Sequence, residues 1–148
     1  MKKTVIFALS IVFLIVSFGL RDKNKEIEQK SVEKSEKSQK ILKIIEIADT
    51  DAKRTRGLSG KEGLGEKEGM LFVFDKEGYY GIWMKDMKFP IDIAWLNKDK
   101  KIIYLAENVL PETYPKVFNS PVPILYVLEI PAGFLLKYNI KIGDFVAF

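Results

Sequence analysis

The chain has 148 residues, of which 47% are hydrophobic and 30% are charged, and it contains no cysteine and no histidine. The length suits one globular domain, and the missing residue types exclude disulfides, thiol nucleophiles, Ser-His-Asp triads and metal sites built from thiolates or imidazoles. The net charge of +4 comes from residues 1–40, because residues 41–148 carry fifteen basic and fifteen acidic side chains. A neutral domain of this kind argues against nucleic acid as a partner.

The N-terminus predicts a signal peptide or a membrane anchor over residues 1–20. Lys2 and Lys3 precede a run of sixteen uncharged, mostly apolar residues, 5–20. As a helix this run covers roughly 24 Å, which is less than the ~30 Å hydrocarbon core of a bilayer. It is longer than the apolar region of most signal peptides. Cleavage and retention as an anchor both remain open. In either case we expect the domain on the extracytoplasmic side, secreted or held at the membrane.

Residues 21–40 predict a charged linker. Twelve of these twenty residues are charged, and only Ile27 and Val32 are aliphatic. Such a segment cannot bury a face, so we expect a solvated spacer. Glu26 and Lys30 stand four residues apart, a spacing that supports a helix.

The remaining residues, 41–148, predict a single mostly β domain. A strand is expected at 41–48, followed by a short helix that Thr50 caps and Gly57 ends. Short runs typical of strands follow at 70–74, 79–85, 91–96, 102–107, 124–130 and 144–148, with a second short helix at 132–138. Because the connections look too brief for crossover helices, the pattern predicts an antiparallel sandwich or small barrel of six to seven strands.

One segment of the domain, 108–123, interrupts this series of strands. It carries four of the six prolines of the chain. A loop of this length in a small domain is either functional or loosely ordered. A structural or partner-binding module that uses this proline-rich loop is therefore one alternative for the function.

The order of several short motifs resembles a known family. These motifs are Arg54 and Arg56 with Gly57-Leu58, Gly69-Met70-Leu71-Phe72, Trp83-Met84-Lys85, Pro90-Ile91-Asp92-Ile93, Tyr126-Val127-Leu128-Glu129, Ala132-Gly133 and Gly143-Asp144. The chain is similar, over essentially all of 41–148, to the domain of unknown function 192 family, also called UPF0127. The resemblance implies a compact, mostly β fold, often behind a signal or an anchor, and it implies no activity. Asp86 and Met87 depart from the family pattern, which usually reads Asn-Thr there.

A hairpin is predicted between residues 80–86 and 91–96. Its turn would pair Lys85 with Asp92 and place Trp83 opposite Ala94. A large aromatic side chain beside an ion pair is a common floor for a ligand site.

The candidate ligand-binding residues are Arg56, Trp83, Lys85, Asp92 and Glu129. We expect them to meet at one end of the sheet and to bind a polar ligand or a cell-surface partner. A purely structural alternative makes Lys85 and Asp92 a cross-strand pair and gives Glu129 an arginine or a loop backbone as its partner. A third alternative is an enzyme that uses Asp92 and Glu129 as an acid/base pair on a glycan or similar substrate.

Methionine thioethers offer a further candidate site. Met70, Met84 and Met87, beside Trp83, are soft ligands of the kind that Cu(I) prefers. Core packing is the simpler role for Met70 and Met84. We therefore expect no metal and no cofactor.

Overall fold

A computed structural model describes residues 42–148 and six residues of the N-terminal segment, namely Lys23, Lys25, Glu26, Gln29, Lys30 and Glu33. The chain divides into two units, Met1–Lys34 and Ser35–Phe148. In the first unit the six residues are helical, and Lys30 pairs with Glu26 at 2.7 Å, as the spacing predicts. The apolar run 5–20 lies outside the described residues. No helix within the described residues is long and apolar enough to cross a membrane.

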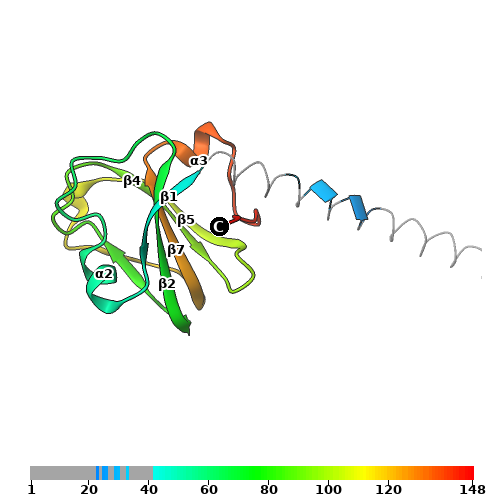
Figure 1. Ribbon diagram of the computed structural model, residues 1–148, viewed down its shortest axis with the longest axis horizontal. Helices are drawn as coiled ribbons and strands as arrows, with labels where there is room; N and C mark the ends of the chain where they lie inside the picture. The colour runs from blue at the N-terminus through cyan, green and yellow to red at the C-terminus, as the bar shows by residue number, and fades with distance from the viewer. Residues whose placement is uncertain (1–22, 24, 27–28, 31–32, 34–41) are drawn as a thin grey trace, which may run out of the picture. The chain divides into compact units, whose positions relative to one another are not determined.

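The domain is built on one open sheet of five strands (Figure 1). Its order is β1 (Lys43–Ala48), β2 (Glu68–Gly78), β7 (Ile124–Pro131), β4 (Ile91–Leu96) and β5 (Ile102–Val109). The pair β1 and β2 is parallel, and the other three pairings of neighbouring strands are antiparallel. The mostly β class is therefore confirmed, but the purely antiparallel sandwich or barrel is wrong. Residues 49–67 are long enough to carry a parallel crossover, and they include a helix.

Local signals placed that helix correctly. It is α2 (Asp51–Arg56), and the hydroxyl of Thr50 accepts a hydrogen bond from the backbone N–H of Lys53 at 3.4 Å. Gly57 follows with a φ of 51°, in the region that favours glycine. The second helix, α3 (Phe134–Lys137), is shorter than predicted.

Two further strands form a small second sheet. They are β3 (Gly81–Trp83) and β6 (Val117–Asn119), which pair antiparallel. The predicted hairpin between β3 and β4 is therefore wrong, and Lys85 does not pair with Asp92. Every residue of β4 is buried, and both of its edges are occupied by β5 and β7, so no edge is left for β3.

The proline-rich segment is more ordered than a free loop. It contains the single-turn helix η1 (Pro111–Thr113) as well as β6. In contrast, the strand expected at 144–148 is reduced to one isolated bridge between Phe145 and Lys101.

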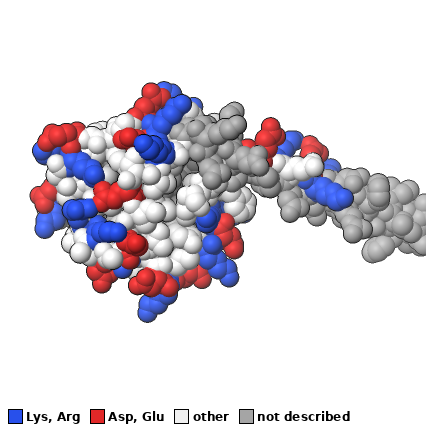
Figure 2. All heavy atoms as spheres, in the orientation of Figure 1, with Lys and Arg blue, Asp and Glu red and all other residues white. Residues whose placement is uncertain are grey.

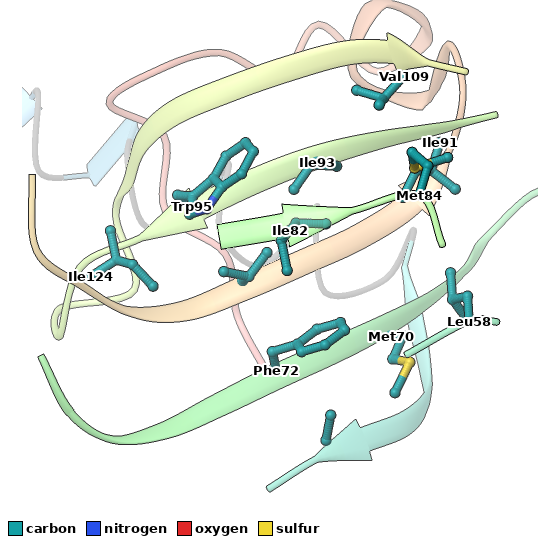
Figure 3. Packing of buried hydrophobic residues seen from close by; sticks show 12 residues of the cluster. Leu58, Met70, Phe72, Ile82, Met84, Ile91, Ile93, Trp95, Val109 and Ile124 are labelled. Carbon is teal, nitrogen blue, oxygen red and sulfur yellow. The ribbon is translucent and has the colours of Figure 1, made fainter. Parts of the chain in front are cut away.

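Two apolar clusters cover the two faces of the five-stranded sheet. In Figure 3 the side chains of Phe72, Ile93 and Trp95 pack with Ile82 of β3 on one face. The other face packs against α3 and the C-terminal segment, through residues such as Leu96, Ile130, Phe134, Leu135 and Val146. Met70 and Met84 are buried in the first cluster, which confirms their expected packing role.

Candidate functional site

A groove of about 540 Å³ opens on the domain beside α2, β2 and the small β3–β6 sheet. We call it the outer groove. Its lining comprises Asp51, Arg54, Thr55, Phe74, Asp75, Lys76, Tyr80, Gly81, Trp83, Val117 and Asn119. The rings of Phe74 and Tyr80 stack with 3.6 Å between their centroids and form an aromatic part of this wall. The groove thus offers both flat aromatic surface and charged side chains to a ligand.

A second, much smaller pocket adjoins the outer groove. This inner pocket has a volume of about 30 Å³, close to that of one water molecule in the liquid. It shares Arg54, Thr55, Gly81 and Trp83 with the outer groove. The rest of its lining is Arg56, Gly57, Leu58, Ser59, Phe72, Ile82, Met87 and Glu129.

Glu129 is the unusual residue of the inner pocket. Its side chain is buried, and the atom Oε2 has no hydrogen-bond partner in the described part of the chain. A Cβ placed on Gly57 would lie 3.9 Å from this oxygen, so a side chain at position 57 would approach it. Burial raises the pKa of Glu129 from its ordinary value of 4.5 to about 8. The carboxyl is therefore mostly protonated and neutral at pH 7.

The sheet itself aims Glu129 at this pocket. Glu129 lies on the central strand β7, opposite Met70 of β2 on one side and Ile93 of β4 on the other. Residues directly opposite one another in an antiparallel pair point to the same face. Glu129 therefore shares the face of the cluster that Phe72 and Ile82 occupy, and a carboxyl stands where the pattern of the strand calls for an apolar side chain.

The two arginines of α2 are engaged elsewhere. Arg54 donates hydrogen bonds to the backbone carbonyl of Val73 and to the carboxylate of Asp51, both at 2.7 Å. Arg56 forms an ion pair with Glu46 of β1. Burial raises the pKa of Glu46, but hydrogen bonds from Lys61 and Arg56 together outweigh it, so the pKa lies below its ordinary value. The expected pairing of an arginine with Glu129 is thus not what the structure shows.

Asp92 occupies a different environment. Its Oδ1 accepts the backbone N–H of Asn108 at 2.8 Å, and its Oδ2 accepts that of Leu135 at 3.0 Å. Asp92 lies opposite Ile130, so it faces the other side of the sheet from Glu129. It ties the end of β5 and the start of α3 to β4. An acid/base pair made of Asp92 and Glu129 is excluded by this geometry.

Of the five residues predicted for the site, the structure brings three together. Arg56, Trp83 and Glu129 all line the inner pocket, and Trp83 is 44% exposed at the junction with the outer groove. Lys85 is exposed beyond the end of β3, where its backbone carbonyl accepts the hydroxyl of Ser59 at 2.8 Å, and Asp92 lies on the opposite face.

Sequence reasoning missed most of the outer groove. Phe74, Gly81 and Val117 come from three separate strands; β3 and β6 pair with one another, and Phe74 belongs to β2 of the other sheet. Gly57 was visible as a helix terminator, but nothing in the sequence shows that it faces Glu129. Within the described residues, no group of three or more Asp or Glu side chains is placed to hold a metal ion.

Comparison with known proteins agrees with the fold and leaves the activity open. A crystal structure of a protein of unknown function from Novosphingobium aromaticivorans has 31% sequence identity and a TM-score of 0.66, over 69% of this chain and 72% of that chain. A protein from Sinorhizobium meliloti, described as a proposed transcription regulator, has 29% identity and a TM-score of 0.67, over 70% of this chain and 78% of that chain. No curated protein matches the chain. The DUF192 family, described as uncharacterised ACR, COG1430, matches residues 31–148, and the chain belongs to that family.

Proposed function

We propose that the domain is a binding module for a small polar ligand, which occupies the outer groove and reaches into the inner pocket. The observation that carries this proposal is the buried Oε2 of Glu129, which has no partner within the described residues and faces an open pocket. Leaving a buried polar atom unpaired costs about 1–3 kcal/mol. A ligand that supplies the missing hydrogen bond accounts for a carboxyl at a position where an apolar residue would be more stable.

Trp83 supports the same site. Its side chain is partly exposed and lines both the inner pocket and the outer groove, so part of the indole is available to contact a ligand. The proline-rich segment contributes through Val117 and Asn119 of β6, which line the groove. A role for that segment in binding is thus part of this proposal.

The charge distribution supports a small ligand over nucleic acid. Residues 41–148 carry equal numbers of basic and acidic side chains, and on the face seen in Figure 2 the two kinds are interspersed. A surface that binds phosphate backbones needs a basic patch. We therefore do not extend the description of the Sinorhizobium protein to this chain.

A fragment screen by NMR tests the proposal. The chain is labelled with ¹⁵N, and the indole N–H of Trp83 reports on binding in the groove, while that of buried Trp95 serves as the internal control. We expect polar fragments to shift the Trp83 signal and to lose affinity for the Trp83→Ala variant. The proposal fails if fragments that bind the chain leave Trp83 unperturbed, or if none binds.

We also propose that the domain acts outside the cytoplasm, through export or anchoring by residues 1–20. Lys2, Lys3 and the apolar run that follows them support this location. Fractionation of cells that express the whole chain, with the intact mass of the product, tests it. A membrane or exported product is expected. Recovery of the intact chain, Met1 to Phe148, in the cytosolic fraction would contradict the proposal.

A further inference from the structure

The polar groups of the inner pocket restrict which part of a ligand can enter. Four of its lining residues are large and apolar, namely Leu58, Phe72, Ile82 and Met87. The polar group at the end of the pocket is the carboxyl of Glu129, which is buried and has a free oxygen. The hydroxyl of Ser59 is already used, because it donates to the carbonyl of Lys85. Within the described residues, the free oxygen of Glu129 is thus the buried side-chain polar atom that a ligand group can satisfy among these apolar walls.

The arginines that line the inner pocket are engaged with other residues. Arg54 and Arg56, both from α2, are the other charged side chains that line the inner pocket. Each is paired with a carboxylate, Arg54 with Asp51 and Arg56 with Glu46. From the neighbouring strands, the residues opposite Glu129 are Met70 and Ile93, which are apolar. Neither arginine is paired with Glu129, so the carboxyl has no ion-pair partner in the part of the chain that the structure describes.

This arrangement discriminates between ligand groups by their hydrogen-bonding needs. An ammonium group would bring a full charge and three donors into a space whose walls are largely apolar. A carboxylate carries the same penalty of charge. A neutral carbonyl oxygen is satisfied by one donor, and a protonated carboxyl supplies one.

We infer that the inner pocket binds the carbonyl oxygen of a neutral ligand, such as an amide or an ester, which accepts a hydrogen bond from the protonated carboxyl of Glu129. This inference rests on the proposed binding function and specifies the chemical class of the ligand. No proton is transferred and no covalent bond changes. The volume of about 30 Å³ accommodates the carbonyl oxygen, while the remainder of the ligand lies in the outer groove.

The test uses the whole chain and three small probes at millimolar concentration, which are acetamide, methylammonium and acetate. Binding is followed by the Trp83 indole signal and by the ¹³C carboxyl signal of Glu129. We expect acetamide to bind and the other two to bind at least tenfold more weakly. Since only the protonated carboxyl donates, affinity for acetamide should fall about 30-fold from pH 6 to pH 9.5 for a group with a pKa of about 8.

Two variants separate the hydrogen bond from the shape of the pocket. In Glu129→Gln the amide donates at every pH, so acetamide should bind with no dependence on pH in this range. In Glu129→Leu the donor is absent, and binding of acetamide should be lost although Trp95 fluorescence shows an intact core. Equal affinity of the chain and of Glu129→Leu for acetamide would overturn the inference.

The remaining outcomes distinguish the two proposals. Preferential binding of methylammonium, with affinity that rises with pH, would identify a cation site and would refute the carbonyl class while the binding function stands. A response at Trp83 without any change at Glu129 would likewise refute the carbonyl class while the binding function stands. If neither residue responds to any of the three probes or to the fragment screen, the binding function and the inference both fail.

Discussion

Asp92 and Glu129 lie on adjacent strands but point to opposite faces of the sheet, because Asp92 is opposite Ile130 and Glu129 is opposite Ile93. Both carboxyls are buried. Each oxygen of Asp92 accepts a backbone N–H, whereas Oε2 of Glu129 has no partner within the described residues. Their removal should therefore change stability in opposite directions.

Replacement of Glu129 by glutamine should remove a pH-dependent loss of stability. Burial raises the pKa of Glu129 to about 8 in the folded chain, above its ordinary value of 4.5. Between these two values the folded state keeps a proton that the unfolded state has lost. The free energy of unfolding therefore falls as pH rises through this window, by about 1.4 kcal/mol per pH unit. Urea unfolding at several pH values measures this slope.

The matched control for this experiment is Glu107→Gln, which changes an exposed glutamate on β5. It should leave the pH dependence unchanged, whereas Glu129→Gln should flatten it and should be the more stable protein at pH 8. A parallel pH dependence for the chain and for Glu129→Gln would show that this carboxyl is ionised in the folded state at neutral pH.

Replacement of Asp92 by asparagine should destabilise the domain. Asparagine keeps one carbonyl oxygen, so the N–H of Asn108 or that of Leu135 would face an amide NH₂ group. The expected loss is about 1–3 kcal/mol in the free energy of unfolding. Asp99→Asn, at an exposed position, is the control and should change stability by less than about 0.5 kcal/mol. An Asp92→Asn variant as stable as the control would contradict the role that we assign to Asp92.

A side chain at position 81 should disturb the outer groove. A Cβ on Gly81 would lie 2.3 Å from Cγ1 of Val117 and 2.6 Å from Oδ1 of Asn119. Gly81→Ala should therefore push β6 away from β3 and weaken fragment binding. The double variant with Val117→Ala removes the closer contact and should recover part of the stability, which a double-mutant cycle measures. Additive effects of the two substitutions would argue against this close contact.

The two tryptophans should respond differently to a quencher. Trp83 is 44% exposed and Trp95 is fully buried, with its indole N–H 3.3 Å from the carbonyl of Tyr80. Acrylamide should quench the chain much more than the Trp83→Phe variant, in which only Trp95 emits. A fragment bound in the outer groove should protect Trp83 from acrylamide. Equal quenching of the two proteins would place Trp83 away from solvent.

Sequence reasoning succeeded where the determining interactions are local. The N-cap at Thr50 and the stop at Gly57 predicted both ends of α2, and the apolar run predicted β4 at Ile91–Leu96. It failed where pairing is distant in the chain. β3 and β6 have only three residues each and are separated by more than thirty positions, so periodicity carries no signal for their pairing.

The candidate site shows the same division. Glu129 was noticed because an acid interrupts an apolar strand, and Trp83 because it is a large aromatic side chain near the end of a strand. Lys85 and Asp92 were joined to them only through a hairpin that does not form, because β5 and β7 already occupy both edges of β4. A local anomaly could thus be detected, but the partners of the anomalous residue depended on the topology.

The candidate site is divided between two sheets, so its outer wall and its buried carboxyl depend on different parts of the fold. Glu129 belongs to the centre of the five-stranded sheet, where substitutions affect the core, whereas Val117 and Asn119 belong to a three-residue strand outside it. Substitutions in β6 therefore change the wall of the outer groove without altering the buried carboxyl. Under the proposed binding function, we expect such substitutions to alter the selectivity for a ligand and to leave the hydrogen bond at Glu129 in place.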